Sequence, residues 1–279
     1  MHLVNQADEW GVAYDAMGHA TGAMGTDVFT NGEGQWLVVG NFADEPDNLY
    51  WRRPGDAFFM ELAAARGLGA LTRQVLTFGT LFVDLNLDGQ PELVQVNGHV
   101  ENEIHRVSSQ QTYAQPPQVF SYCEGCGKQW RLTDSLQDKR WVGRGLATGD
   151  FNRDGRPDLV VTQVARPAII LINQTYQSGR ALAVRLEGLA TNRTAIGARV
   201  EVWHQGKPLA TRRQVPVRGY YSQSSPELIF GIPLSIETVT IKVLWPDGSK
   251  STQTVTLSRE RTGIRLWHPK RSGKLAQQS

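Results

Sequence analysis

The sequence has few cysteines, no long apolar run and no excess of one sign of charge. Of its 279 residues two are cysteines, and 29 Lys plus Arg balance 27 Asp plus Glu, for a net charge of +2. This balance gives no reason to expect nucleic acid as a partner. No stretch approaches the roughly 20 apolar residues of a membrane helix, so no membrane span is predicted. The opening MHLVNQADEWGVAYD lacks a basic segment followed by an apolar one, so we expect no signal peptide there.

The patterns of common catalytic sites are also missing. The sequence contains no Gly-x-Ser-x-Gly, no Gly-x-x-x-x-Gly-Lys-Ser/Thr and no His-Glu-x-x-His. We therefore predict a non-enzymatic protein with no catalytic residues. The alternative is an enzyme or enzyme subunit that uses the stretch NGHVENEIH, where four side chains could form a metal or acid-base cluster: His99, Glu101, Glu103 and His105. Exposed polar alternation at the edge of a sheet explains that stretch equally well.

The two cysteines form the sequence CEGC at Cys123 and Cys126. Redox catalysis by such a pair uses a strand-to-helix context, whereas VFSYCEGCGKQWRL is typical of a hairpin tip. A structural zinc site would need four thiolate or imidazole ligands, and the chain has two thiols. We expect a local disulfide or two free thiols, and a redox role remains a third functional alternative.

A nine-residue pattern is present twice, as DLNLDGQPE at 84–92 and DFNRDGRPD at 150–158. Oxygen-bearing side chains at every second position, with a glycine at the turn, are how a protein loop binds calcium. An Asp-Gly hairpin turn is the alternative, but two copies in the same register gather carboxylates that repel one another unless a cation lies between them. We predict bound Ca²⁺ with the following ligands, of which Gln90 and Arg156 use only the backbone carbonyl: Asp84, Asn86, Asp88, Gln90, Glu92, Asp150, Asn152, Asp154, Arg156 and Asp158.

These loops differ from EF-hands. An EF-hand requires a glutamate at loop position twelve and a helix on each side, but that position holds Gln95 and Val161. The flanking runs TLFVD, ELVQVNG and DLVVTQV are short and β-branched, which predicts strands. A third, degenerate copy, DVFTNGEGQW from Asp27, has Phe29 and Gln35 at ligand positions, so we expect no metal there.

The repeats predict the domain organisation. Sheets of this size must stack to bury both faces, and a β-propeller is the usual solution. We predict propeller repeats over 1–177, with units near 22–70, 78–135 and 144–175. After residue 178 alternating strands indicate a small β-sandwich-like domain at 178–268, followed by a basic disordered tail at 269–279. Only FMELAAARG, residues 59–67, is predicted to be helical.

With these motifs in view, the sequence resembles a known combination of families. VGRGLATGDFNRDGRPDLVVTQ and LVQVNGHV resemble the FG-GAP or VCBS repeats of calcium-binding propeller blades. NRTAIGARVEVW, GYYSQSSPELIFG and VLWPDGS resemble the ASPIC/UnbV domain, and the combination is similar to the cartilage acidic protein family. The resemblance implies a calcium-bearing propeller followed by a β domain, and it supplies no catalytic residues. Such propellers usually have about seven blades, whereas about three units are visible here.

The resemblance also implies a function and a compartment. We expect a calcium-binding repeat protein that binds a protein or glycan partner in an extracellular or periplasmic location. Because the visible blades form an incomplete set, further N-terminal blades or a homo-oligomer would cover the open strand edges. The stretch RGYYSQSS, residues 218–225, suits recognition of a protein or sugar. The alternative, which we favour slightly, is a structural crossover whose Ser and Gln side chains satisfy the backbone.

Overall fold

The chain is almost entirely β-structure. The computed structural model describes residues 2–259 and 261–271, so positions 272–279 of the predicted tail lie outside the described residues. Five small sheets contain the strands, and propeller blades followed by a sandwich confirm the predicted fold class. The helical segments are α1 (Gly69–Thr72), η1 (Ile104–Arg106) and η2 (Glu124–Cys126). None of the helices within the described ranges is long and apolar enough to cross a membrane.

The predicted helix at 59–67 is wrong. Met60 and Glu61 instead form a short strand that pairs with the preceding strand of the first sheet. The Glu61 carboxylate accepts hydrogen bonds from the backbone N–H groups of Leu49 and Ala63, at 3.0 Å each. Tertiary pairing therefore overrides the helix propensity of the alanine run that follows.

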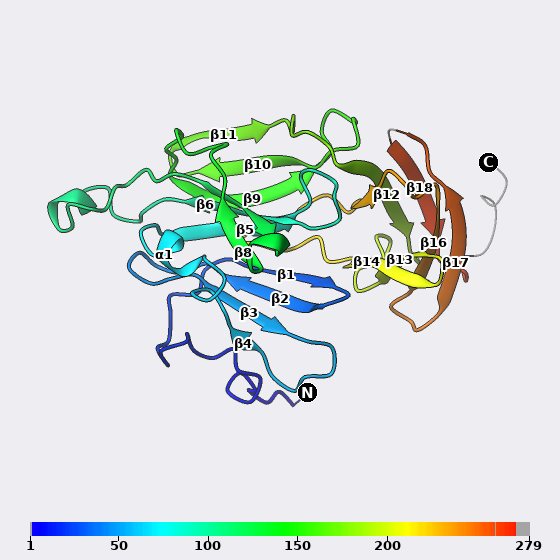
Figure 1. Cartoon of the computed structure of the whole chain (residues 1–279), viewed down its shortest axis with the longest axis horizontal. Coiled ribbons are helices and arrows are strands. Elements are labelled where there is room, and N and C mark those ends of the chain that lie inside the picture. Colours follow the sequence, from blue (N-terminus) through cyan, green and yellow to red (C-terminus); the bar gives the residue numbers. More distant parts are fainter. Residues whose placement is uncertain (1, 260, 272–279) are drawn as a thin grey trace.

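Three sheets are propeller blades made of consecutive antiparallel strands. The first blade contains β1 (Thr26–Asn31), β2 (Gly34–Val39), β3 (Asn48–Arg52) and β4 (Met60–Glu61). The second contains β5 (Thr77–Val83), β6 (Glu92–Asn97), β7 (Gln118–Cys123) and β8 (Gln129–Leu132). The third contains β9 (Gly143–Gly149), β10 (Asp158–Gln163) and β11 (Arg166–Leu171). The first strands of the three blades, β1, β5 and β9, are spatial neighbours, and Figure 1 shows the blades side by side.

Apolar side chains join the blades face to face. In β2 the alternation is regular, so that Trp36 and Val38 point into a core shared by the first and second blades. A second core lies between the second and third blades and includes Leu81 and Val161. Because the second blade is covered on both faces, all seven residues of β5 are buried. This explains why the sequence TFGTLFV is an apolar run without alternation.

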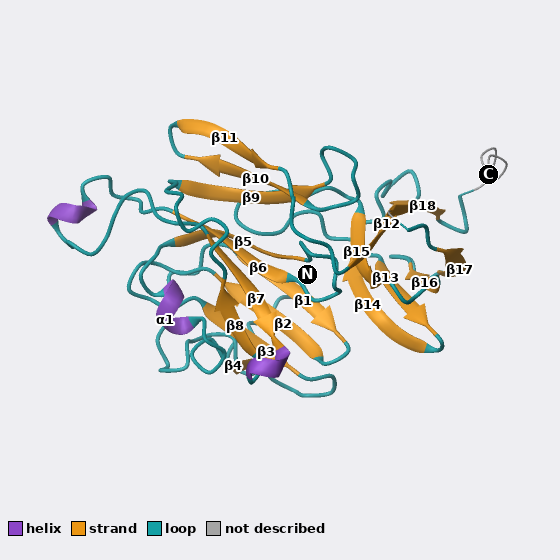
Figure 2. Ribbon diagram, turned by 45° about the horizontal axis from the view of Figure 1, so that its top comes forward, coloured by secondary structure: helices purple, strands orange, loops and turns teal. Residues whose placement is uncertain are grey.

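Two further sheets form the C-terminal domain. One contains β12 (Gly179–Glu187), β15 (Leu228–Pro233) and β18 (Arg261–Trp267), with β12 parallel to β18. The other contains β13 (Arg199–His204), β14 (Lys207–Arg213), β16 (Thr238–Leu244) and β17 (Lys250–Thr256). The two sheets share one buried core that includes Phe230 and Trp245. Figure 2 shows this sandwich beside the ends of the blades.

Candidate calcium loops and their junction with the C-terminal domain

The two nine-residue repeats occupy equivalent places in two blades. Residues 84–91 connect β5 to β6, and residues 150–157 connect β9 to β10, so each loop follows the innermost strand of its blade. Both loops turn through left-handed residues at their fourth and sixth positions. The φ angles are 59° at Leu87 and 90° at Gly89, and 64° at Arg153 and 88° at Gly155. Glycine at the sixth position adopts this conformation without steric cost.

Side chains of the first loop hold its backbone in a fixed shape. Oδ2 of Asp84 accepts a hydrogen bond from the N–H of Gly89 at 3.0 Å. Oδ1 of Asn86 accepts from the N–H of Asp88 at 3.0 Å, and Oδ1 of Asp88 accepts from the N–H of Gln90 at 2.7 Å. These hydrogen bonds hold the carboxylate and amide oxygens against the backbone of the loop.

The second loop repeats this hydrogen-bond pattern. Oδ2 of Asp150 accepts from the N–H of Gly155 at 3.0 Å. Oδ1 of Asn152 accepts from the N–H of Asp154 at 3.2 Å, and Oδ1 of Asp154 accepts from the N–H of Arg156 at 2.8 Å. Two loops with the same sequence pattern therefore have the same local geometry.

The ninth residue of each repeat closes its loop from the start of the next strand. In the first loop, Glu92 accepts a hydrogen bond from the N–H of Leu85 at 2.8 Å. Asp158 does the same for the N–H of Phe151 at 2.8 Å in the second. Each pair joins the second loop position to the ninth, so these hydrogen bonds hold the carboxylate against the loop.

One carboxylate oxygen in each loop remains buried and without a hydrogen bond. Within the described part of the chain, Oδ1 of Asp84 and Oδ1 of Asp150 have no hydrogen-bond partner. The side chain of Asp150 is 2% exposed, and Asp84 as a whole is 5% exposed. An unsatisfied buried carboxylate oxygen costs about 1 to 3 kcal/mol or more. In both loops, the first position therefore offers an oxygen that a bound cation would satisfy.

Burial also changes the acidity of the first loop. It raises the pKa of Asp84 to about 6, and Asp88 adds to the increase by repulsion. The pKa of Glu92 rises to about 8, mainly through burial and further through the charges of Asp84 and Asp88. Burial and the negative charges nearby thus disfavour the ionised forms of Asp84 and Glu92, an electrostatic situation that a divalent cation would relieve.

The donor chemistry of each loop fits calcium, although its charged side chains do not converge on one point. No group of three or more Asp, Glu, His or Cys side chains in residues 2–259 and 261–271 is arranged to hold a metal ion. Calcium also takes amide and backbone carbonyl oxygens as ligands. The loops offer such a mixed set through Asn86, Asn152 and the carbonyls of Gln90 and Arg156, together with the buried oxygen at each first position.

Arginine side chains bind the carboxylates of the second loop. The Arg156 guanidinium lies 2.7 Å from Oδ2 of Asp154. Burial would raise the pKa of Asp154, but hydrogen bonds from Arg156 lower it below its ordinary value. From the C-terminal domain, Arg261 lies 3.6 Å from Oδ2 of Asp150. The sequence suggested only a backbone role for Arg156, and its side chain would compete with a cation for Asp154.

A residue that the sequence did not indicate connects the two loops. The N–H of Asn173, just after β11, donates to Oδ1 of Asp158 at 2.8 Å. Its side-chain amide donates to the carbonyl of Leu85 in the first loop, also at 2.8 Å. Asn173 is buried, and only the three-dimensional packing of the blades reveals its role.

The degenerate copy in the first blade has a different structure. Asp27 lies inside β1 rather than in a loop, opposite Val38 of β2. Its Oδ2 accepts a hydrogen bond from the N–H of Phe82 at 2.8 Å and lies 3.3 Å from the Arg218 guanidinium. Burial raises the pKa of Asp27 against these interactions. The carboxylate joins the first two blades and the C-terminal domain.

An extended arm, residues 214–227 between β14 and β15, leaves the sandwich and crosses all three inner strands. The N–H of Gly219 donates to the carbonyl of Thr26 in β1 at 3.0 Å. The Arg218 guanidinium donates to the carbonyl of Phe82 in β5 at 2.8 Å. In β9, the N–H of Thr148 donates to Oγ of Ser224 at 3.2 Å. RGYYSQSS thus has the structural crossover role that we favoured, with serine hydroxyls satisfying backbone groups.

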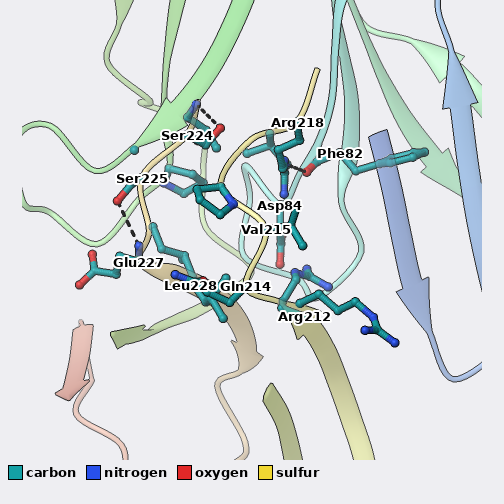
Figure 3. A pocket seen from close by; sticks show the side chains of 17 residues that line it. Phe82, Asp84, Arg212, Gln214, Val215, Arg218, Ser224, Ser225, Glu227 and Leu228 are labelled. Atoms are coloured by element: carbon teal, nitrogen blue, oxygen red, sulfur yellow. Dashed lines mark hydrogen bonds between the residues drawn. The ribbon is translucent and has the colours of Figure 1, made fainter. Parts of the chain in front are cut away.

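The arm and the first loop enclose a small cavity of about 80 Å³. Figure 3 shows Asp84, Arg212 and Arg218 around it, with Ser224 and Ser225 on the arm. Burial lowers the pKa of Arg212, while the charge of Asp84 opposes that decrease. The cavity therefore lies at the junction of the two domains, next to the first candidate calcium loop.

NGHVENEIH does not form an acid-base cluster. His99 is buried, and its Nδ1 accepts a hydrogen bond from the N–H of Glu101 at 3.0 Å. Burial lowers the pKa of this imidazole, which favours the neutral ring. Glu103 pairs with Arg106 at 2.5 Å, and His105 lies exposed in the following short helix. His99 acts as a packing residue against the ring of Phe42.

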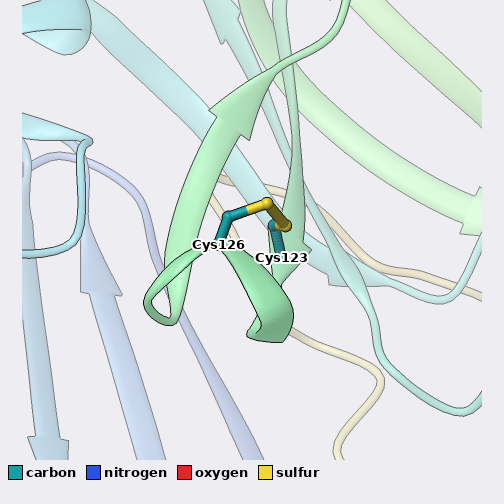
Figure 4. Close-up of a disulfide and its surroundings, with 2 residues drawn as sticks. All are labelled: Cys123 and Cys126. Atoms are coloured by element: carbon teal, nitrogen blue, oxygen red, sulfur yellow. A yellow bond between two sulfur atoms is a disulfide. The ribbon is translucent and has the colours of Figure 1, made fainter.

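The cysteine pair forms a disulfide at a hairpin end. Cys123 ends β7, and Cys126 ends the short helix η2 before β8. Figure 4 shows the bond at this tip, which is the hairpin location that the sequence predicted. The disulfide closes a short local loop between β7 and β8 of the second blade, whereas the first candidate calcium loop of that blade connects β5 to β6.

Comparison with protein families assigns two regions of the chain. The family described as ASPIC and UnbV matches residues 188–267, within the sandwich. The FG-GAP repeat family matches residues 142–163, which comprise β9, the second loop and β10. No curated protein matches the chain. The chain thus combines an FG-GAP repeat with a C-terminal ASPIC/UnbV domain, as the sequence motifs indicated. This combination indicates a propeller protein with a binding role.

Proposed function

We propose that the protein is a non-enzymatic, calcium-stabilised binding protein that recognises a protein or glycan outside the cytoplasm. The observation that carries the proposal is the pair of loops at 84–92 and 150–158. They share sequence pattern, backbone conformation and hydrogen bonds, and each holds one buried carboxylate oxygen without a hydrogen bond among the described residues. When bound, calcium supplies positive charge that lets neighbouring carboxylates ionise together.

Calcium has an architectural role in this proposal. Asp84 and Asp150 are each placed at the end of an innermost strand, and the loops that they begin carry the backbone into the next strand. Neutralising their charge would stabilise the connection between β5 and β6 and between β9 and β10. The blades would then present a fixed surface to a partner, with no chemical step at the metal.

Three observations support the proposed location and the proposed absence of catalysis. The disulfide between Cys123 and Cys126 is of a kind that persists in oxidising compartments, where calcium is also abundant. The inner strands that would line a propeller mouth are hydrogen-bonded to the arm. His99, the centre of the alternative catalytic cluster, is engaged in packing.

Thermal melting with millimolar calcium and with excess chelator tests the proposal. At ten times its Kd, calcium stabilises a site by about 1.4 kcal/mol, which corresponds to a rise of a few degrees in melting temperature. Asp154→Ala should lower the melting temperature clearly more in calcium than in chelator, where only its hydrogen bonds with Asn152 and Arg156 are lost. Asp138→Ala is the matched control, because this carboxylate is exposed and lies outside both loops.

The alternative reading of the loops predicts a different result. If they are only Asp-Gly turns, the wild-type chain will melt at the same temperature in calcium and in chelator. Equal losses from Asp154→Ala in both buffers would likewise show that the carboxylate has a structural role without calcium. Either result contradicts the proposal.

A further inference from the structure

Both candidate calcium loops contact the ASPIC/UnbV domain on one side, although each also has exposed residues. Leu87, at the turn of the first loop, is fully buried. A β-carbon added to Gly231 of β15 would lie 2.6 Å from the Leu87 carbonyl oxygen and 2.3 Å from Oδ2 of Asp84. One added to Gly179 of β12 would lie 2.1 Å from the same carbonyl oxygen. The sandwich therefore approaches the first loop so closely that two glycines are required.

The second loop contacts the same domain through an arginine. A β-carbon added to Gly155 would lie 3.1 Å from the aliphatic carbons of Arg261 in β18. The Arg261 guanidinium lies 3.6 Å from Asp150 and 3.0 Å from Glu227, at the end of the arm. Arg261 thus joins the C-terminal domain to the second loop next to the turn at Gly155.

The linker between the domains is fixed to the loops as well. The N–H of Ser178 donates to the carbonyl of Asn86 at 2.8 Å. Asn173, a few residues earlier, bridges Asp158 and the carbonyl of Leu85. Backbone groups of the first loop therefore have two tasks, since they belong to a candidate calcium loop and also accept the hydrogen bonds that position the linker.

We propose that the two loops form a docking site for the ASPIC/UnbV domain and that this docking depends on calcium. This inference rests on the calcium binding proposed above and adds a consequence for the arrangement of the domains. Without a cation, Oδ1 of Asp84 stays buried without a hydrogen-bond partner among the described residues, which destabilises the first loop in this shape. The Leu87 carbonyl that lies against β12 and β15 and the Asn86 carbonyl that binds the linker would then be held less firmly. Calcium orders these groups, so the sandwich and its arm dock more firmly on the blades.

Coupling of this kind is reciprocal. If calcium strengthens docking of the domain, then docking strengthens calcium binding by the same factor. Changes in the arm, which contacts the blades through β1, β5 and β9 and contains no proposed ligand, should therefore weaken calcium binding. A loop that bound calcium independently of the sandwich would not respond to such changes.

Hydrogen exchange of the wild-type chain in calcium and in chelator measures the docking directly. The reporters are the amides of Ser178, Gly219 and Ser225, whose acceptors belong to the blades. We expect their exchange to accelerate at least several-fold in chelator. The amides between β13 and β16 are the reference, because they lie within the sandwich, and their exchange should stay unchanged.

Calorimetric titration with calcium tests the reverse direction and separates the two hypotheses. The double variant Ser222→Ala/Ser224→Ala removes two hydroxyls that accept hydrogen bonds from β9, and we expect it to bind calcium several-fold more weakly. Thr254→Ala, on the exposed strand β17, is the matched control. Absence of any calcium binding by the wild type would refute the proposed function. Calcium binding without a change in exchange at the reporter amides would refute only the calcium-dependent docking of the domain.

Discussion

Asp47 provides a test of the electrostatics inside the blades. The side chain is 1% exposed, and its Oδ1 accepts a hydrogen bond from the N–H of Asn41 at 2.7 Å. Oδ2 accepts from the side-chain amide of Gln95 in β6, also at 2.7 Å. Burial raises the pKa of Asp47 from 3.8 to about 7, although these hydrogen bonds oppose the increase. The carboxylate therefore joins the first two blades at a cost that depends on pH.

The direction of the pH effect on stability follows from the raised pKa of Asp47. In the folded chain Asp47 keeps its proton over a pH range in which the unfolded chain has released it. Its contribution to stability is therefore greatest below the unfolded pKa of 3.8 and decreases as the pH rises toward about 7. For these two pKa values, the free energy of unfolding should fall by roughly 2 to 3 kcal/mol between about pH 5 and about pH 8.

Asp47→Asn should remove this decrease. Oε1 of Gln95 is buried without a hydrogen-bond partner among residues 2–259 and 261–271, so rotation of that amide lets it accept a hydrogen bond from the new side chain. Urea denaturation at several pH values, with calcium in constant excess, gives the free energy of unfolding. As the pH rises over this range, we expect the free energy of unfolding of the variant to increase relative to that of the wild type by roughly 2 to 3 kcal/mol.

Two controls make the result decisive. Asp27, Asp84 and Glu92 also have raised pKa values, so only the difference between variant and wild type isolates Asp47. Asp134→Asn changes an exposed carboxylate in the same blade region and should leave the pH dependence unchanged. Parallel curves for wild type and Asp47→Asn would refute the reasoning.

Three further predictions concern packing around the domain junction and the disulfide. Gly231→Ala places a β-carbon 2.3 Å from a carboxylate oxygen of Asp84 and should destabilise the fold by about 1 to 3 kcal/mol or more in urea unfolding, whereas Gly263→Ala, with open space around it, should change stability by less than about 0.5 kcal/mol. Tyr220→Ala should lower the melting temperature because its ring packs against an aromatic ring of β5, whereas Tyr221→Ala should not, since that side chain is 94% exposed; equal effects would contradict the arm's packing. Replacing both cysteines with serine should cost about 2 kcal/mol by loop entropy and leave the calcium-dependent change in melting temperature intact, which parallel melts in calcium and chelator would check.

The sequence allows the shared conformation of the two candidate loops to be predicted because their information is local. Ligand spacing, the glycine at the sixth position and the β-branched flanks all lie within a few residues of Asp84 and Asp150. Strand alternation and turn residues likewise suffice to predict an all-β chain with a change of pattern near residue 178. The short strand β4 was missed because its pairing with β3 overrides the helix propensity of the following alanines.

The surroundings of the loops could not be predicted in the same way. Asn173, Gly231 and Arg261 approach the loops from distant positions in the chain. Each of these residues is ordinary in its own local sequence, and its role depends on how the sandwich lies against the blades. Only the packing of complete domains brings them to Asp84 and Asp150.

The path of the arm has a consequence for folding order. Strands β1, β5 and β9 are synthesised long before residues 214–227, yet their backbone groups are satisfied by that later segment. Contacts of such high sequence separation form slowly, because a long loop must close before they contribute. During synthesis the inner strand edges of the three blades would stay accessible until the arm emerges, after β12, β13 and β14 of the sandwich. The time needed to synthesise and dock the arm should therefore set how long the inner strand edges of the nascent chain are open to aggregation.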